Sequence, residues 1–276
     1  MKLRLPLPLW LLVAALPASA ATVYEWSFDS GNLSAAAGNG TMGTAGASTP
    51  GLISFSTTDG GTVPHIGGIP AAYLSVPAFA TGTNGIQLTF GDSGPNGGGA
   101  YLNQYTILMD LYSPGAAGWQ ALMNTDPSNG NDADWYISNT GATGIGALTY
   151  SAGGTVTQNA WHRLAMSADL GAGTVKYYMD GTLVATRTGA SLLDGRFAIY
   201  TNAHAGVDLM LFNEGDTSGN YVHPLLVNSI AFTDQTLGDS AIQALGGPSA
   251  GGILVPEPSA AALGILGSIA LLRRRR

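Results

Sequence analysis

The feature that most constrains the fold is a repeated alternation of short strand-like segments and turn residues along the chain. Thirteen segments of five to eight residues are rich in β-branched and aromatic residues, and Gly, Asn, Asp and Ser separate them. This pattern predicts an antiparallel β-sandwich or barrel. Glycine fills 40 of the 276 positions, about twice its usual frequency, which fits many tight turns. The predicted strands cover residues 22–28, 52–56, 72–76, 86–90, 105–112, 119–124, 134–138, 161–168, 174–180, 183–188, 196–201, 207–212 and 226–233.

Two local signals are clearer than the rest. Asp180-Gly181 separates two of the strand segments, and this pair tolerates the positive φ angles of a two-residue hairpin turn. The segment 238–247 has capping residues at its start and a glycine pair at its end, so it predicts the one helix of the body.

Composition excludes several kinds of chemistry. The chain has no cysteine, so disulfides, thiolate metal centres and cysteine nucleophiles are excluded. Residues 21–255 contain 4 basic and 16 acidic side chains, a formal charge of −12. A surface of that sign repels phosphate backbones, which argues against nucleic acid as a partner.

The first 20 residues, MKLRLPLPLWLLVAALPASA, have two basic residues, an apolar run and a small-residue end. This order is typical of a secretory signal peptide and predicts cleavage by signal peptidase before Ala21. We therefore expect an exported protein.

The chain ends with an uncharged run at 259–272, which follows a glycine-rich linker at 248–255. As a helix this run reaches roughly 21 Å, short of the ~30 Å hydrocarbon core, and it spans only with help from snorkelling arginines. The basic end is then expected to stay cytoplasmic, which predicts an inner-membrane anchor before processing. The basic cluster consists of Arg273, Arg274, Arg275 and Arg276.

Pro256, Glu257 and Pro258, followed by the apolar run and the arginine cluster, resemble the PEP-CTERM sorting signal of Gram-negative bacteria. The resemblance covers residues 256–276. It implies recognition by an exosortase-type enzyme, cleavage near the Pro-Glu-Pro motif, and release to the cell surface or an exopolysaccharide matrix. A plain tail anchor is the alternative.

A strand that opens with Trp161-His162, the Asp180-Gly181 hairpin, and a last strand followed by a short helix resemble the LamG-like, concanavalin A-type domain. The resemblance covers residues 21–247. It implies an antiparallel jelly-roll β-sandwich of lectin type, a fold that often binds calcium through acidic loops.

Two loops concentrate oxygen ligands that suit Ca²⁺. Residues 124–134 hold three aspartates and three asparagines, and residues 213–216 form a second acidic turn. The alternative is that these residues only form turns and keep the surface hydrated. The candidate calcium ligands are Asp126, Asn129, Asp132, Asp134, Glu214 and Asp216.

A glycoside hydrolase is the enzyme alternative, because some hydrolases share the jelly-roll sandwich, and it needs two carboxylates about 5–10 Å apart. The body has only two glutamates, Glu25 and Glu214. Glu214 and Asp216 resemble the first half of the Glu-x-Asp-x-x-Glu motif of laminarinase-like enzymes, but Gly219 stands where the third acid belongs. The carboxylate set is incomplete, so we expect no catalysis.

Trp119 and Trp135 are the candidate ligand-binding residues, since an indole face can stack on a sugar ring. The alternative is that both belong to the core. The sequence thus predicts an exported, non-catalytic protein that binds a glycan or matrix polymer. A glycoside hydrolase and a purely structural matrix protein are the other readings.

Overall fold

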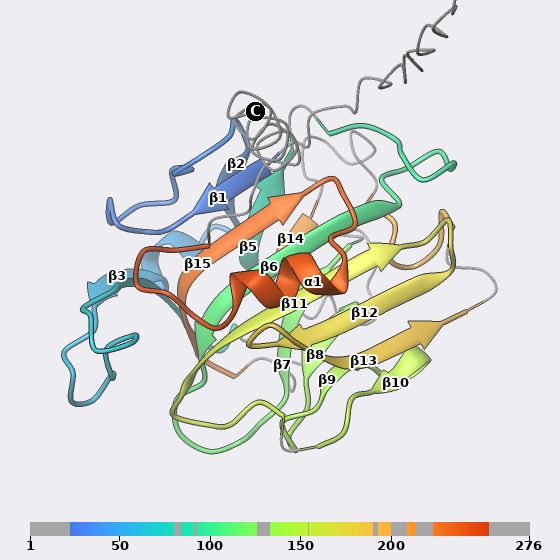
Figure 1. Ribbon diagram of the computed structural model, residues 1–276. Coiled ribbons are helices and arrows are strands. Elements are labelled where there is room, and N and C mark those ends of the chain that lie inside the picture. Colours follow the sequence, from blue (N-terminus) through green and yellow to red (C-terminus); the bar gives the residue numbers. More distant parts are fainter. Residues whose placement is uncertain are drawn as a thin grey trace, which may run out of the picture. The chain divides into compact units, whose positions relative to one another are not determined.

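Two antiparallel sheets packed face to face make up the part of the chain that the computed structural model describes (Figure 1). The described residues are 23–79, 84–90, 93–125, 133–153, 155–189, 193–199, 209–213 and 223–253. They belong to one structural unit, Thr22–Val255. The predicted all-β, two-sheet antiparallel sandwich is therefore confirmed.

Sheet A has eight strands among the described residues, and every neighbouring pair in it is antiparallel. Its long central strands carry most of the pairing, and β1 pairs with the same strand as β4 and β6. Its order is β13 (Thr182–Thr188), β12 (Thr174–Met179), β11 (Trp161–Asp169), β6 (Gln104–Tyr112), β15 (Leu225–Thr233), β4 (Ala72–Val76) and β3 (Ser54–Thr57), with β1 (Val23–Trp26) beside β15.

Sheet B has seven strands among the described residues, and most are short. Its order is β10 (Thr149–Tyr150), β9 (Thr143–Ile145), β8 (Trp135–Ile137), β7 (Gln120–Asn124), β14 (Leu209–Leu211), β5 (Gly85–Thr89) and β2 (Thr41–Ala45). Two 3-10 turns, η1 (Thr49–Gly51) and η2 (Gly146–Leu148), precede β3 and β10.

The main core lies between the two sheets and follows from the two-residue period of a strand. In β11, Leu164 and Met166 are buried in it, while Ala165 between them belongs to a separate cluster on the outer face of sheet A. In β8, Trp135 and Ile137 are fully buried. Each large apolar side chain buried in this way contributes about 1.5–3 kcal/mol.

The predicted hairpin joins β12 to β13. Asp180 has a φ of 49° and Gly181 a φ of 79°, the conformation that a two-residue turn between twisted strands requires. A Cβ on Gly181 would also lie 3.2 Å from the carbonyl oxygen of Gln243. Glycine at position 181 therefore meets two requirements. It adopts the positive φ angle of the turn, and its lack of a side chain leaves room for helix α1.

Helix α1 (Asp239–Leu245) crosses the outer face of sheet A in front of its central strands (Figure 1). Its buried residue Ile242 packs with Leu108, Tyr178 and Ile253. This confirms the predicted helix and gives it a structural role, because it covers apolar side chains that face away from the main core.

Some predicted elements differ from the structure. Residues 196–199 form turns and an isolated bridge from Ile199 to Leu102 rather than a strand. β2, β9 and β10 were not predicted, because these segments are short and two of them contain glycine. They complete sheet B, and β10 contributes to the site described below.

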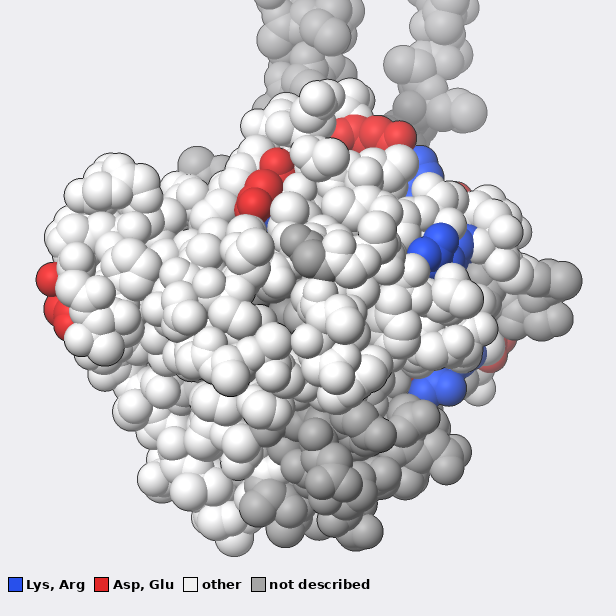
Figure 2. Space-filling view, turned by 90° about the horizontal axis from the view of Figure 1, so that it is seen from below, with Lys and Arg blue, Asp and Glu red and all other residues white. Residues whose placement is uncertain are grey.

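Charged side chains form small, separate patches on the face of the molecule shown in Figure 2. Figure 2 shows one face of the molecule, on which most of the described surface carries no Lys, Arg, Asp or Glu. The described surface on this face is therefore dominated by uncharged polar and apolar groups.

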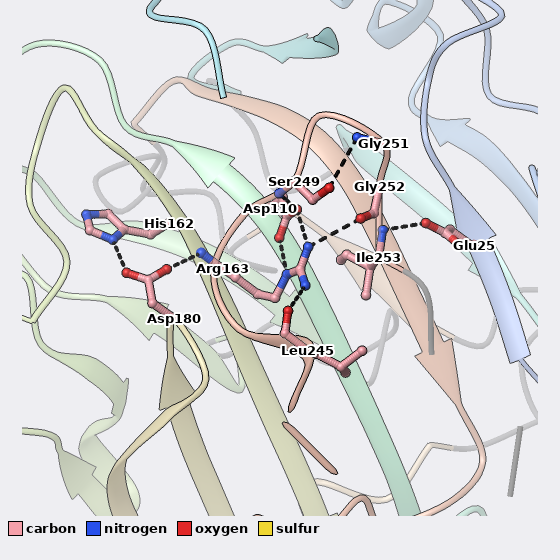
Figure 3. Close-up of polar contacts among 10 residues, drawn as sticks. All are labelled: Glu25, Asp110, His162, Arg163, Asp180, Leu245, Ser249, Gly251, Gly252 and Ile253. Carbon is pink, nitrogen blue, oxygen red and sulfur yellow. Dashed lines mark hydrogen bonds and ion pairs between the residues drawn. The ribbon is translucent and has the colours of Figure 1, made fainter. Parts of the chain in front are cut away.

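Residues 246–253, which we call the C-terminal strap, are held on sheet A by a buried polar network (Figure 3). Arg163 Nη1 donates to the carbonyl oxygen of Leu245 at 2.7 Å, and Nη2 donates to that of Gly252 at 3.3 Å. Glu25 accepts a hydrogen bond from the backbone N–H of Ile253 at 2.5 Å. The sequence predicts a linker over residues 248–255. In the structure, the described part of that segment, residues 248–253, is bonded to sheet A.

The two ends need a correction. Among the described residues, no helix has both the length and the apolar character to cross a membrane, which conflicts with the predicted localisation through a C-terminal membrane anchor. The predicted signal peptide, residues 1–20, and the predicted sorting signal, residues 256–276, lie outside the described residues.

Candidate functional site

A pocket lined by aromatic side chains lies on the outer face of sheet B. Trp119, immediately before β7, Tyr136 of β8 and Tyr150 of β10 form its walls, together with Arg196. Residues 145–147 at the η2 turn complete the lining. The cavity volume is about 190 Å³, smaller than the pockets that hold drug-sized ligands. It suits a single small ring rather than a large cofactor.

The strand pattern explains why these rings face outward. In β8 the flanking residues Trp135 and Ile137 point into the core, so Tyr136 between them points to the opposite face. Tyr136 pairs across the strands with Ala121, whose small side chain leaves room beside the ring. Ala121 and Ala133 pack with Tyr136 on this face, with Trp119 and Tyr150 against them, and the aromatic rings form the walls of the pocket.

The three rings stand edge to face. The Trp119 and Tyr150 ring centroids are 5.4 Å apart with an interplanar angle of 69°, and those of Trp119 and Tyr136 are 6.3 Å apart at 86°. This is a favourable arrangement for aromatic quadrupoles. Tyr136 is buried, and its hydroxyl accepts a hydrogen bond from the Ala133 backbone N–H at 2.8 Å. Trp119 and Tyr150 are only partly buried, so they are the rings that a ligand can reach.

A charged pair supports the polar side of the pocket. Arg196 Nε donates to Asp134 Oδ1 at 2.6 Å, and the Asp134 side chain is only 1% exposed. The other carboxylate oxygen accepts hydrogen bonds from the backbone N–H and the hydroxyl of Thr125, at 2.8 and 2.7 Å. Burial raises the pKa of Asp134, and the bonds from Thr125 and Arg196 oppose that shift. Asp134 thus fixes the guanidinium at the pocket wall.

The structure separates the two predicted ligand-binding tryptophans. Trp119 lines the pocket, as a stacking residue would have to. Trp135 is fully buried, and its Nε1 donates to Thr143 Oγ1 at 2.7 Å. The prediction for Trp135 is wrong, because its side chain points into the core and has no face open to a ligand.

Of the six predicted calcium ligands, only Asp134 lies among the described residues. Asp134 lies in the ion pair with Arg196, so its carboxylate already has a cationic partner. Among the described residues, no group of three or more His, Asp or Glu side chains is placed to hold a metal. The other predicted ligands lie outside the described residues: Asp126, Asn129, Asp132, Glu214 and Asp216.

Sequence reasoning missed three of the four side chains that form the pocket. Alternation within residues 134–138 could have placed Tyr136 opposite Trp135. Tyr150 belongs to a two-residue strand that no periodicity reveals. Arg196 fell in a segment predicted as a strand, where its contact with Asp134 spans 62 residues of sequence.

Glu25, one of the two glutamates considered for hydrolysis, is not one of the residues that line this pocket. It belongs to the strap network (Figure 3). Its side chain is buried and bonded to the Ile253 backbone. Desolvation raises its pKa, opposed by that backbone bond. Glu25 therefore has a structural partner rather than an open approach for a substrate.

The fold has relatives among solved structures. No protein-family model matches the chain, and no characterised protein matches it in sequence. Domain 4 of AbnA, a GH43 extracellular arabinanase from Geobacillus stearothermophilus solved in complex with arabinotriose, aligns with a TM-score of 0.50 and 19% identity. That alignment covers 83% of this chain and 100% of the arabinanase domain. The protein therefore belongs to the class of antiparallel β-sandwiches that includes this domain.

Two further similarities are weaker. The botulinum neurotoxin serotype D binding domain gives a TM-score of 0.48 at 10% identity, over 82% of this chain and 51% of that one. The CBM40 of the Ruminococcus gnavus IT-sialidase, bound to α2,3-sialyllactose, gives 0.39 at 19% identity, over 53% and 84%.

Proposed function

We propose that this protein binds a glycan, without catalysis, in the pocket formed by Trp119, Tyr136, Tyr150 and Arg196. The observation that carries the proposal is the pair of partly exposed rings, Trp119 and Tyr150, on the outer face of sheet B. A sugar ring has an apolar C–H face that stacks on an aromatic ring and hydroxyl groups that accept or donate hydrogen bonds. The pocket offers both kinds of contact.

The fold neighbour adds support from a different side. The arabinanase domain of the same architecture was solved with arabinotriose bound, so this sandwich is compatible with an oligosaccharide ligand. The net charge of residues 21–255 indicates which class of glycan to expect. Residues 21–255 have a formal charge of −12, and the Arg196 guanidinium is paired with Asp134. We therefore expect neutral oligosaccharides to bind better than acidic ones.

The test is a glycan array probed with the purified full-length protein, carrying neutral arabino-, xylo-, gluco- and manno-oligosaccharides beside sialylated and uronic acid glycans. The dissociation constant of the strongest neutral ligand is then measured by titration calorimetry. Trp119→Ala is expected to weaken binding at least about tenfold, which corresponds to about 1.4 kcal/mol.

Tyr73→Ala is the matched control for a second pocket variant, Tyr150→Ala. Both tyrosines are partly buried, but Tyr73 lies on β4 of sheet A. Binding should survive the Tyr73 change and be lost with the Tyr150 change. A blank array would refute glycan binding and favour a purely structural role. Equal affinity for wild type and Trp119→Ala would refute this pocket as the binding site.

A further inference from the structure

Arg187 lies on the inner face of sheet A at the open edge of the sandwich. It belongs to β13, the outermost strand of sheet A, and pairs across to Val175. Cross-strand partners project from the same face of a sheet, and Val175 is fully buried in the main core. The Arg187 side chain therefore starts from the core side and reaches along the gap toward sheet B.

Its guanidinium contacts the edge strand of the opposite sheet. Arg187 Nε donates to the carbonyl oxygen of Thr149 at 3.3 Å, and Nη2 donates to that of Tyr150. Both acceptors are the two residues of β10, the outermost strand of sheet B. The ion pairs found among the described residues do not include Arg187, so its hydrogen bonds go to backbone carbonyls.

β10 is held in its sheet by few strand pairings. It pairs with β9 at only two positions, Thr149 with Ile145 and Tyr150 with Gly144. Thr149 also has a φ of 70°, a left-handed conformation that a β-branched residue adopts only when its surroundings enforce it. A two-residue strand with such a residue at its start needs an external anchor to keep one conformation.

We propose that Arg187 is a positioning residue for the glycan pocket, which clamps the β10 backbone so that the Tyr150 ring stands against Trp119. This inference rests on the proposed function. Arg187 is not one of the residues that line the pocket. It acts through the backbone that carries Tyr150, whose ring centroid lies 5.4 Å from that of Trp119. The clamp prepares the wall before a sugar arrives, so binding costs less ordering of the loop and ring.

The first measurement needs no ligand. Hydrogen–deuterium exchange is followed on the full-length wild type, Arg187→Ala and Arg187→Lys. We expect faster exchange in peptides covering residues 146–152 for Arg187→Ala, with peptides from β6 and β11 unchanged. Lysine keeps the charge but has no planar fork to bond two carbonyls at once, so Arg187→Lys should resemble Arg187→Ala. Unchanged exchange at residues 146–152 would overturn the inference.

The second measurement is a double-mutant cycle on binding of the strongest neutral oligosaccharide from the array. Arg187→Ala should weaken binding about threefold to tenfold, the size expected for one wall that must be ordered on binding. Combined with Tyr150→Ala it should add almost nothing, because both changes remove the same wall. Additive losses would mean that Arg187 acts separately from Tyr150 and would overturn the inference.

Lys176→Ala is the charge control. Lys176 is a cation on the neighbouring strand β12, and it pairs with Asp239 on the outer side of sheet A. An equal loss in Lys176→Ala and Arg187→Ala, or full affinity in Arg187→Lys, would show that charge alone matters and would overturn the clamp. If Arg187→Ala binds like wild type while Tyr150→Ala does not bind, the clamp fails and the glycan pocket stands. If wild type binds no sugar, both fail together.

Discussion

The Arg163 guanidinium and the Asp110 carboxylate form a two-pronged ion pair between neighbouring strands of sheet A. Nε lies 2.6 Å from Oδ1 and Nη2 lies 2.7 Å from Oδ2. Asp110 is fully buried and Arg163 is 3% exposed. Asp110 also accepts a hydrogen bond from the Ser249 backbone at 3.0 Å. The pair therefore joins β6 and β11 to the C-terminal strap, and its charges compensate each other away from water.

Removing one partner of this pair should be costly. In Asp110→Asn, the Arg163 guanidinium stays buried and faces a neutral amide, so we expect a loss of about 3–5 kcal/mol in the free energy of unfolding. Urea unfolding at neutral pH measures it. The exposed pair of Lys176 and Asp239 serves as the control, and Lys176→Gln should leave the midpoint almost unchanged. A small loss in Asp110→Asn would mean that water reaches the site.

The pH dependence of stability should change when Glu25 is replaced. Desolvation raises the pKa of Glu25 in the folded protein above its usual value of 4.5. Between 4.5 and the raised pKa, the folded state binds more protons than the unfolded state, so this group makes stability fall as pH rises. Glu25→Gln keeps an oxygen for the Ile253 N–H and removes the titration.

The difference between the two unfolding free energies tests this, measured by urea unfolding from about pH 4.5 to about pH 7. Taking this difference cancels the pH-dependent contributions that the other acidic residues make to the unfolding free energy of both proteins. We expect the glutamine variant to gain stability relative to wild type as pH rises. A difference that stays constant over this range would contradict a raised pKa.

The two tryptophans should respond in opposite ways to truncation. Trp135 is fully buried in the core, so Trp135→Ala should cost about 3–5 kcal/mol in unfolding free energy. Trp119 is partly exposed at the pocket, so Trp119→Ala should mainly reduce glycan affinity. Thermal unfolding and calorimetric titration on both variants separate the effects. Comparable destabilisation by the two substitutions would contradict the assignment.

Asp134 should stabilise the fold without help from calcium. Its carboxylate is bonded to Arg196 and Thr125, and hydrogen bonds to a charged group are worth about 1.5–3 kcal/mol. Asp134→Asn should therefore lower the thermal midpoint by the same amount in calcium and in chelator. Asp132→Ala is the companion variant for the calcium site predicted within residues 124–134. A midpoint shift for Asp134→Asn that appears only in calcium would restore Asp134 as a metal ligand.

Secondary structure was predicted correctly where one short sequence motif is enough to specify the backbone conformation. The Asp180-Gly181 turn joins β12 and β13 as expected, because its φ angles depend on those two residues alone. The two motifs that suggested a lectin-type sandwich also meet in space, since His162 Nδ1 lies 2.9 Å from Asp180 Oδ2. The short strand β10 escaped prediction, because two residues contain no period to detect.

The candidate site was predicted only in part. Trp119 was named from its chemistry, which a single residue type carries. Trp119 reaches the pocket and Trp135 does not, because their side chains lie on opposite sides of sheet B. The side that each residue faces follows from strand register across the sandwich. The roles proposed for Arg187 and Arg196 depend on partners 37 and 62 residues away in the chain, and no local pattern specifies such contacts.

The sequence by itself determined the class of fold, the hairpin, the helix and the acidic character of the body, because strand period, turn chemistry and charge are properties of neighbouring residues or of simple counts. The tertiary structure alone decided which aromatic rings reach the surface and which carboxylates are paired with arginine. Those outcomes depend on how distant strands pack, where burial makes each polar group take a partner from another part of the chain.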